Sequence, residues 1–197
     1  MQSALKKENH YTYADFCTWP EDERWEIIDG VVYSKYAPYD ATYAKASPVV
    51  SHQSVLFELA VQLRDFLKGH KCKVFIAPVS VRLNADTEDN TVVEPDILVV
   101  CDESKIDGKG VVGAPDFIAE VLSPSTARYD KITKCNLYQR SGVREYWIVD
   151  PDRKTVTAHT QDDGANYVAQ TYDKHDTAVP VGVLENCTIN LTDVFGD

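Results

Sequence analysis

Residues 116–151 read DFIAEVLSPSTARYDKITKCNLYQRSGVREYWIVDP, and this stretch decides the fold. Its first part, 116–123, is an apolar run that predicts a strand. A helix is predicted next, with Ser125 or Thr126 as its cap and its end at about Ser141. Residues 144–150 predict a further strand. A strand, a helix and a strand in succession indicate an α/β or α+β domain.

The rest of the chain supplies more strands than helices. A hairpin is predicted over 25–33, around Asp29-Gly30. Residues 34–50 have no clear period and predict a loop, and apolar residues at helical spacing then predict a helix from Ser51 that Gly69 ends. The remaining predictions, in chain order, are a short helix at 12–19, a strand at 72–83, a turn at 84–90, a strand at 91–101, a loop at 102–114, an antiparallel pair at 156–160 and 166–172, and a short strand within 183–194. We therefore expect one domain over 1–197, with a mixed sheet flanked by two helices and with additional hairpins.

Composition excludes several classes of protein. The chain has 197 residues, of which 44% are hydrophobic, a proportion typical of globular proteins rather than disordered ones. No apolar stretch approaches the ~20 residues that span a bilayer, and the first residues lack the apolar centre of a signal peptide. With 20 basic and 31 acidic residues the net charge is −11, which argues against binding nucleic acid by bulk charge. A local basic groove or a metal-bridged contact with phosphate stays open.

The cysteines predict no zinc site. The five cysteines are odd in number and widely separated, and no two have the spacing of a zinc knuckle. We expect all of them to be reduced thiols that behave as small hydrophobic residues, in a cytoplasmic protein.

Acidic residues that interrupt apolar strands are the first candidates for chemistry. Asp96 lies within 92–100 and Glu120 within 117–122, both otherwise apolar. Because side chains alternate along a strand, Glu94 and Asp96 are expected on one face, and Asp96 and Glu120 can converge if their strands are neighbours. Carboxylates gathered in this way suit Mg²⁺ or Mn²⁺. The alternative is that each caps a turn or pairs with an arginine at a strand end.

The helix that follows adds a second candidate feature. Asp130, Lys134 and Tyr138 are spaced i, i+4 and i+8 and share one face. Lys134 could therefore be directed at the carboxylates, where it would stabilise an anionic phosphorane or orient a water. The alternative is a solvated ion pair between Asp130 and Lys134. Taken alone, His52 is typical of a helix cap and Glu26 of an exposed strand residue.

Together these residues resemble the Uma-type branch of the PD-(D/E)XK nuclease superfamily, a branch of bacterial restriction endonuclease-like proteins. The motifs that carry the resemblance are Glu94-Pro95-Asp96, Glu120-Val121-Leu122-Ser123-Pro124-Ser125, Asp130-x₃-Lys134-x₃-Tyr138-x₃-Gly142 and the following 143–151, with Tyr11-Thr12, 25–30 and Ser51-His52-Gln53. The resemblance covers nearly the whole chain.

The resemblance implies a restriction endonuclease-like core with a metal site at the edge of the sheet. Asp96 and Glu120 match the motif acids and would be metal ligands, and Glu26 matches the acid that the superfamily often supplies from its N-terminal segment. The motif lysine should stand two residues after Glu120, where this chain has Leu122. Lys134 is the matching residue on the helix, since a long lysine can reach the same place from a neighbouring element.

The resulting hypothesis is a divalent-metal-dependent endonuclease that hydrolyses DNA. Its catalytic residues would be Asp96, Glu120, Lys134 and Glu26; its metal ligands would be Asp96, Glu120 and Glu26; and His52, Tyr138, Glu94 and Asp130 would line the site. We expect Mg²⁺ or Mn²⁺ as cofactor, DNA as substrate, a homodimer by analogy, and neither a membrane nor a nucleotide cofactor. Two rivals stay open: an inactive nuclease-fold module for binding or assembly, and a hydrolase with a carboxylate pair, such as a glycosidase.

Overall fold

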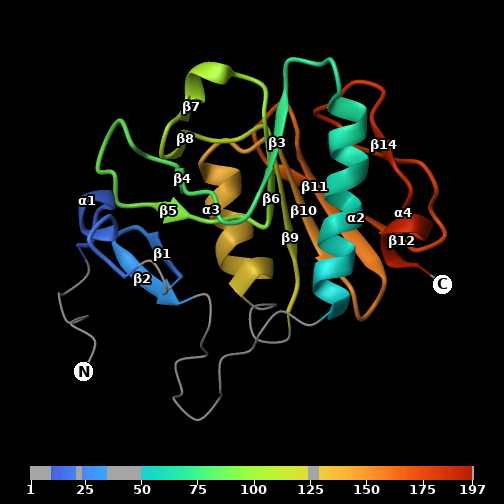
Figure 1. The fold of residues 1–197 in the computed structure, drawn as a ribbon, viewed down its shortest axis with the longest axis horizontal. Helices are drawn as coiled ribbons and strands as arrows, with labels where there is room; N and C mark the ends of the chain where they lie inside the picture. Colours follow the sequence, from blue (N-terminus) through green and yellow to red (C-terminus); the bar gives the residue numbers. More distant parts are fainter. Residues whose placement is uncertain (1–9, 21–23, 35–49, 124–128, 197) are drawn as a thin grey trace, which may run out of the picture.

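Two six-stranded sheets carry the fold in the computed structural model, which describes residues 10–20, 24–34, 50–123 and 129–196 (Figure 1). In spatial order, the first sheet contains β12 (Tyr167–Asp173), β11 (Thr155–Gln161), β10 (Glu145–Asp150), β9 (Phe117–Val121), β6 (Ile97–Val100) and β3 (Lys73–Ile76). The second contains β2 (Val31–Ser34), β1 (Trp25–Ile28), β5 (Val92–Val93), β4 (Val81–Arg82), β8 (Gly110–Val112) and β7 (Ile106–Asp107). A short pair, β13 (Val179–Pro180) and β14 (Thr188–Ile189), lies near the C-terminus.

Helices cover both faces of the first sheet. The long helix α2 (Val50–Leu67) lies on one face with α4 (Leu191–Phe195), and α3 (Cys135–Arg140) lies on the other (Figure 1). The core is divided accordingly: Ile97, Val99, Ala119 and Trp147 pack towards α2, whereas the alternate residues Leu98, Ile118, Ile148 and Tyr146 pack towards α3 and the second sheet. Burial on both faces explains why these strands are apolar at successive positions. The remaining helices are α1 (Tyr13–Phe16), a 3₁₀ turn η1 (Glu103–Lys105) and a π-helical turn η2 (Tyr129–Lys134).

The strand–helix–strand prediction for 116–151 is confirmed. β9 and β10 are neighbours and run parallel, with Ala119 opposite Trp147, and η2 and α3 form the connection. Gly142, with φ of 84°, follows the helix end. The predicted caps Ser125 and Thr126 lie outside the described residues.

The hairpin predictions are also confirmed. β1 and β2 pair around Asp29-Gly30, both at positive φ, and β11 pairs antiparallel with β12 close to the predicted ranges 156–160 and 166–172. The predicted helix from Ser51 is α2, which begins one residue earlier and ends before Gly69. The predicted loop at 34–50 lies mostly outside the described residues. The short strand predicted within 183–194 is β14, and the helix α4 follows it.

Two predicted strands are wrong as single units. The stretch 91–101 is divided into β5 and β6, which belong to different sheets, and 72–83 is divided into β3 and β4 in the same way. A proline interrupts each stretch, Pro95 in the first and Pro78 in the second, and proline cannot donate to a strand ladder. The predicted loop at 102–114 contains the β7–β8 hairpin, in which a Cβ at Gly110 would lie 2.3 Å from the Ser80 carbonyl oxygen. There are consequently two large sheets where one was expected.

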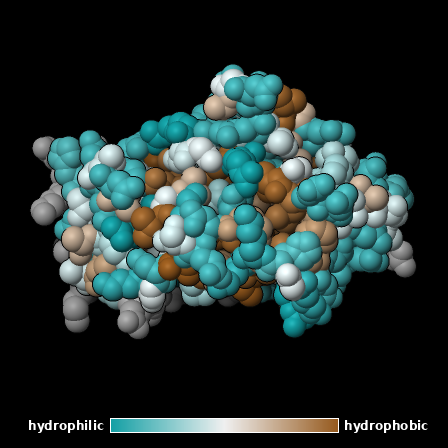
Figure 2. Space-filling model, turned by 90° about the horizontal axis from the view of Figure 1, so that it is seen from above, coloured by the Kyte–Doolittle hydropathy of each residue, from teal (hydrophilic) through white to brown (hydrophobic). Residues whose placement is uncertain are grey.

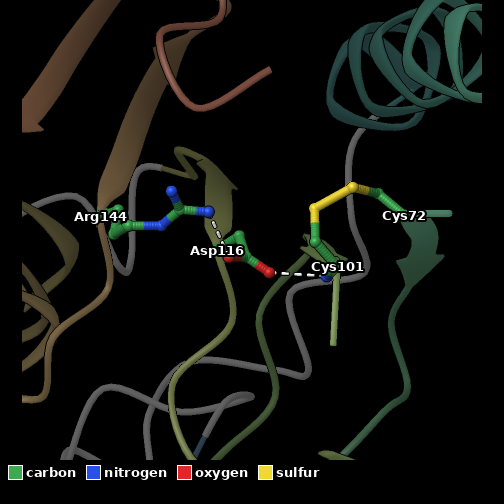
Figure 3. The surroundings of a disulfide bond; sticks show 4 residues. All are labelled: Cys72, Cys101, Asp116 and Arg144. Carbon is green, nitrogen blue, oxygen red and sulfur yellow. Dashed lines mark hydrogen bonds and ion pairs between the residues drawn. A yellow bond between two sulfur atoms is a disulfide. The ribbon is translucent and has the colours of Figure 1, made fainter. Parts of the chain in front are cut away.

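The cysteine prediction is wrong for one pair. Cys72 and Cys101 form a disulfide, while Cys17, Cys135 and Cys187 are free thiols. The β3–β6 register explains the pairing. Lys73 lies opposite Val100, and Cys72, directly before Lys73, therefore lies opposite Cys101, directly after Val100. The Cys101 N–H donates to Asp116 at the start of β9, and Asp116 also pairs with Arg144 (Figure 3). The disulfide therefore ties the edge strand to the strands that carry the candidate site.

The surface is mainly hydrophilic, as the proportion of charged residues leads one to expect. Hydrophilic residues cover most of the face in Figure 2, and hydrophobic residues appear there only in separate patches. Among the described residues, no helix combines the length and the apolar character needed to cross a bilayer.

Candidate active site

A buried ammonium group lies at the centre of the candidate site. Lys134 Nζ is 2.7 Å from Glu120 Oε1, 2.9 Å from Glu26 Oε1 and 3.8 Å from Asp130 Oδ1. Lys134 and Glu26 are each only 1% exposed, so the alternative of a solvated Asp130–Lys134 pair does not hold. A buried charge of this kind is costly unless it is paired, and the three carboxylates supply the pairing.

Three elements from distant parts of the sequence bring these side chains together. Glu120 comes from β9 in the first sheet, and Glu26 comes from β1 in the second. Glu26 Oε1 also accepts the backbone N–H of Glu94, at 2.9 Å, which ties β1 to the segment between β5 and β6. Lys134 reaches both acids from η2. The cluster is thus the place where the two sheets and the connecting helix meet.

The π-helical turn explains how Tyr129 joins the cluster. A π-helix closes its hydrogen bonds between residues i and i+5, so Tyr129 and Lys134 lie about one turn apart, and Lys134 Nζ lies over the Tyr129 ring, 5.5 Å from its centroid. The Tyr129 hydroxyl donates to Glu26 Oε2 at 3.3 Å. The sequence did not predict Tyr129 in this site, because an α-helical period of 3.6 does not place it on the Lys134 face. No signal in the sequence distinguishes the wider turn.

A second tyrosine hydroxyl, that of Tyr138, binds the carboxylate that pairs with Lys134. Tyr138, from α3, donates to the same Glu120 Oε1 at 3.0 Å. Burial raises the pKa of Tyr138 well above its ordinary value. The positive charge of Lys134 opposes this increase, and the negative charges of Glu120 and Glu26 add to it. Burial alone would lower the pKa of Lys134, but Glu120 and Glu26 outweigh it and raise that pKa well above its ordinary value. Lys134 is therefore a permanent positive charge, and Tyr138 is a hydrogen-bond donor rather than an anion.

Asp96 lies beside Glu120 on the neighbouring strand. β6 pairs with β9, with Ile97 opposite Ala119, so one further step of the register sets Asp96 opposite Glu120. Asp96 Oδ2 accepts the Val121 N–H at 3.0 Å and lies 3.4 Å from His52 Nε2, at the start of α2. Asp96 and His52 keep more exposure than the lysine cluster, with side chains 14% and 10% exposed. This end of the site is therefore nearer to solvent.

Glu94 is placed differently from the expectation. Glu94 and Asp96 do not share a strand face, because β5 ends at Val93 and β6 begins at Ile97. The Glu94 carboxylate instead accepts from Arg24, whose Nε and Nη2 lie 2.8 Å and 2.7 Å from Oε2. Arg24 is the second residue near the site that the sequence did not predict. The arginine partner that we considered for the strand carboxylates is thus found at Glu94.

The other lysine positions do not enter the cluster. Leu122, where the superfamily pattern has its lysine, is buried in the core with α3. Lys131 points to Asp150, at 3.6 Å, and is 40% exposed. Of the lysines on η2, Lys134 alone contacts Glu120 among the described residues.

The carboxylates of the site suit a hard divalent cation that takes only one or two ligands from the protein. Asp96 and Glu120 supply carboxylate oxygens at opposite positions of two adjacent chain segments, whereas Glu26 contacts Lys134, the Glu94 N–H and the Tyr129 hydroxyl. Within the described residues, no three His, Cys, Asp or Glu side chains are grouped closely enough to hold a metal ion by themselves. Mg²⁺ is commonly held by one or two carboxylates, with waters and substrate phosphates in the other positions. Asp96 and Glu120 fit that kind of binding.

Comparisons with known proteins give the family and the fold neighbours of this chain. A family model described as "Uma2: Putative restriction endonuclease" matches residues 13–192. An uncharacterized protein of Synechocystis sp., slr1290, is 23% identical over 165 residues, which are 82% of this chain and 80% of that protein. A crystal structure described as a putative nuclease belonging to DUF820, from Anabaena variabilis, has a TM-score of 0.69 at 20% identity and covers 94% of this chain and 97% of its own. This likeness confirms the expected fold class, a mixed α+β fold with sheets flanked by helices.

Proposed function

Because the chain belongs to the Uma2 family, described as "Putative restriction endonuclease", we propose that it is a divalent-metal-dependent endonuclease of the PD-(D/E)XK type that hydrolyses DNA phosphodiester bonds. The coarser statement, a nuclease-like protein, follows from the family and the fold. The metal, the substrate and the roles of individual residues are our proposal.

The observation that carries the proposal is the 2.7 Å contact between Lys134 and Glu120, next to Asp96. Two acids and one lysine in this relation are the group that the superfamily pattern requires. Here the lysine comes from the helix that follows the acidic strand. The position of the ammonium group matters for chemistry, and the element that carries it does not.

In this proposal each side chain of the site has one task. Asp96 and Glu120 would hold Mg²⁺ or Mn²⁺, which when bound would polarise a phosphoryl oxygen and lower the pKa of a water. Lys134, which stays protonated, would stabilise the negative charge that develops on the phosphate in the transition state. Glu26 and Asp130 would position Lys134 rather than bind metal, since both face its ammonium group. Tyr138 would fix the orientation of Glu120, and His52 that of Asp96.

The experiment is a metal titration combined with a cleavage assay. Mn²⁺ and Mg²⁺ would be titrated calorimetrically into the wild type and into Asp96→Ala and Glu120→Gln, with cleavage of single-stranded and double-stranded DNA measured in parallel. We expect both variants to lose metal binding and cleavage together. Glu185→Gln, at an exposed carboxylate outside the site, is the matched control and should behave as the wild type. An Asp96→Ala protein that cleaves as fast as the wild type contradicts the assignment.

An inactive binding or assembly module is the second candidate. The observation that favours it is the net charge of −11, which opposes the approach of DNA. The titration separates the two, because an inactive module would bind no divalent metal at Asp96 and Glu120.

Cleavage of both strands of a duplex at one place requires two sites, and for that reason we include a homodimer in the proposal.

A further inference from the structure

The outer strand β12 is an exposed sheet edge of unusual length for this molecule. β12 has seven residues, whereas the other edge strands of the two large sheets, β3, β2 and β7, have four, four and two. Residues 168–171 are exposed, and β12 pairs only with β11. A long edge of this kind is a template on which another strand can add.

The sequence of β12 lacks the features that usually protect such an edge. Natural edge strands carry charges, prolines or bulges that prevent pairing. Between Tyr167 and Tyr172 the strand reads YVAQTY, with neither a charged residue nor a proline. In a chain of net charge −11, a neutral edge is also a place where two copies can approach without like charges in contact.

Hydrogen bonds of the β11–β12 hairpin fix which backbone groups point outward. The Asp162 N–H donates to the Asn166 carbonyl, and the Gln161 N–H donates to the Arg144 carbonyl on the opposite side. Since backbone groups alternate along a strand, even-numbered residues of β11 face β12 and pair with Val168, Gln170 and Tyr172. The odd-numbered residues of β12, from Tyr167 to Asp173, therefore direct their N–H and C=O groups away from the sheet.

The chain itself occupies the two ends of this outward row. The Tyr167 N–H donates to Gln139 Oε1 at 3.1 Å, and the Asp173 N–H donates to Asp176 Oδ2 at 2.8 Å. Within the described part of the chain, the outward N–H and C=O groups of Ala169 and Thr171 have no such partner. The open part of the edge is short and symmetric about Gln170.

We propose that β12 pairs antiparallel with β12 of a second copy of this chain, about a two-fold axis at Gln170. Ala169 of each copy then lies opposite Thr171 of the other, and each such pair exchanges two backbone hydrogen bonds. Val168, which is 61% exposed, lies opposite Tyr172 of the second copy and becomes covered. An identical strand fits the open row by length and symmetry, as an isologous contact requires. The inference specifies the homodimer of the proposed function, and its test needs neither metal nor DNA.

The first test compares two substitutions at one residue. Ala169→Pro removes an outward N–H and leaves the groups that pair with β11 in place, whereas Ala169→Val keeps that N–H in a good strand former. Oligomeric state is measured by sedimentation equilibrium up to about 0.1 mM protein, and circular dichroism checks that each variant is folded. We expect a dimer for the wild type and Ala169→Val, and dimerisation weakened about tenfold or more for Ala169→Pro. A wild type that stays monomeric, or a dimer that Ala169→Pro leaves unchanged, overturns the proposal.

The second test uses the symmetry and does not depend on how the proline variant folds. Gln170→Lys and Gln170→Glu each place like charges face to face across the axis and should weaken self-association, whereas an equal mixture should form heterodimers, seen by native mass spectrometry. Asp163→Asn changes the net charge by the same amount as Gln170→Lys, lies in the hairpin turn and should leave the dimer intact. A mixture with no preference for heterodimers overturns the two-fold register. Failure of DNA cleavage with an intact dimer would count against the proposed function alone.

Discussion

Lys134 Nζ and Glu120 Oε1 lie 2.7 Å apart in an environment from which solvent is almost absent. Glu120 is contributed by a central strand, and Lys134 by the only turn of π-helix among the described residues. Because the ammonium group also contacts Glu26 on the other sheet, this single contact belongs to a network that joins both sheets. Folding stability therefore depends on the same few atoms to which the proposed function assigns catalysis, and substitutions can separate the two.

Loss of the ammonium group should destabilise the fold strongly. Lys134→Met keeps most of the side-chain volume but leaves Glu26, Glu120 and Asp130 buried beside no cation, which typically costs about 3–5 kcal/mol. Urea unfolding measures the loss. Lys131→Met, at a half-exposed lysine on the same turn, should change the free energy of unfolding by less than about 0.5 kcal/mol. If both variants unfold alike, the buried network does not stabilise the protein as described.

The hydroxyl of Tyr138 should contribute more to the free energy of unfolding than the hydroxyl of its neighbour Tyr146, because its acceptor is charged. Tyr138 donates to the Glu120 carboxylate, whereas Tyr146 donates to the backbone carbonyl of Asp130 at 3.2 Å. The two rings are both fully buried and in edge contact. Tyr138→Phe should therefore cost about 1.5–3 kcal/mol and Tyr146→Phe about 0.5–1.5 kcal/mol in denaturant unfolding. The reverse order would mean that Glu120 does not carry a charge there.

The disulfide predicts a thiol count and a stability difference. Thiol titration of the denatured, unreduced protein should find three free thiols, and reduction should expose all five cysteines. Cys72→Ser/Cys101→Ser should lower the free energy of unfolding by about 2–4 kcal/mol, since the bond closes a loop with a sequence separation of 29. Cys17→Ser, at an exposed free thiol, is the control. Five reactive thiols before reduction would show that the bond does not form.

Glu145 predicts a pH dependence of stability. This carboxylate accepts from Trp147 Nε1 at 2.6 Å and from the Val183 N–H at 2.9 Å, and burial raises its pKa although these hydrogen bonds lower it. A group with a raised pKa in the folded state stabilises the fold below its unfolded pKa, near 4.5, and this contribution is lost as pH rises through the folded value. Relative to Glu145→Gln, the wild type should therefore become more stable as pH falls from 7 towards 4.5.

The measurement for Glu145 is the difference in the free energy of unfolding between the two proteins across that pH range. All other titrating groups are common to both and cancel in the difference. A difference that is independent of pH would show that the pKa of Glu145 is the same in the folded and unfolded states.

The sequence predicted well whatever depends on local spacing. The stripe of Asp130, Lys134 and Tyr138 was visible because neighbours on a helix recur every three or four residues, and the strand acids were visible as interruptions of apolar runs. The contact of Tyr129 with Glu26 was not visible, because it depends on a turn with a different period. The contact of Arg24 with Glu94 joins the residues next to β1 and β5, two neighbouring strands of a second sheet that was itself unexpected. The Cys72–Cys101 pair depends on a strand register that no local pattern fixes.

The step from Val93 to Ile97 has a consequence for how this chain can vary in length. Val93 is held in the register of one sheet, opposite Val81, and Ile97 in that of the other, opposite Ala119. Residues 94–96 are therefore a spacer of fixed length, and one residue inserted or deleted there would force a shift of register in one of the two ladders. Surface turns such as 84–90 carry no such requirement. A shortened or grafted version of the molecule must keep this spacer, together with both ladders that hold its ends.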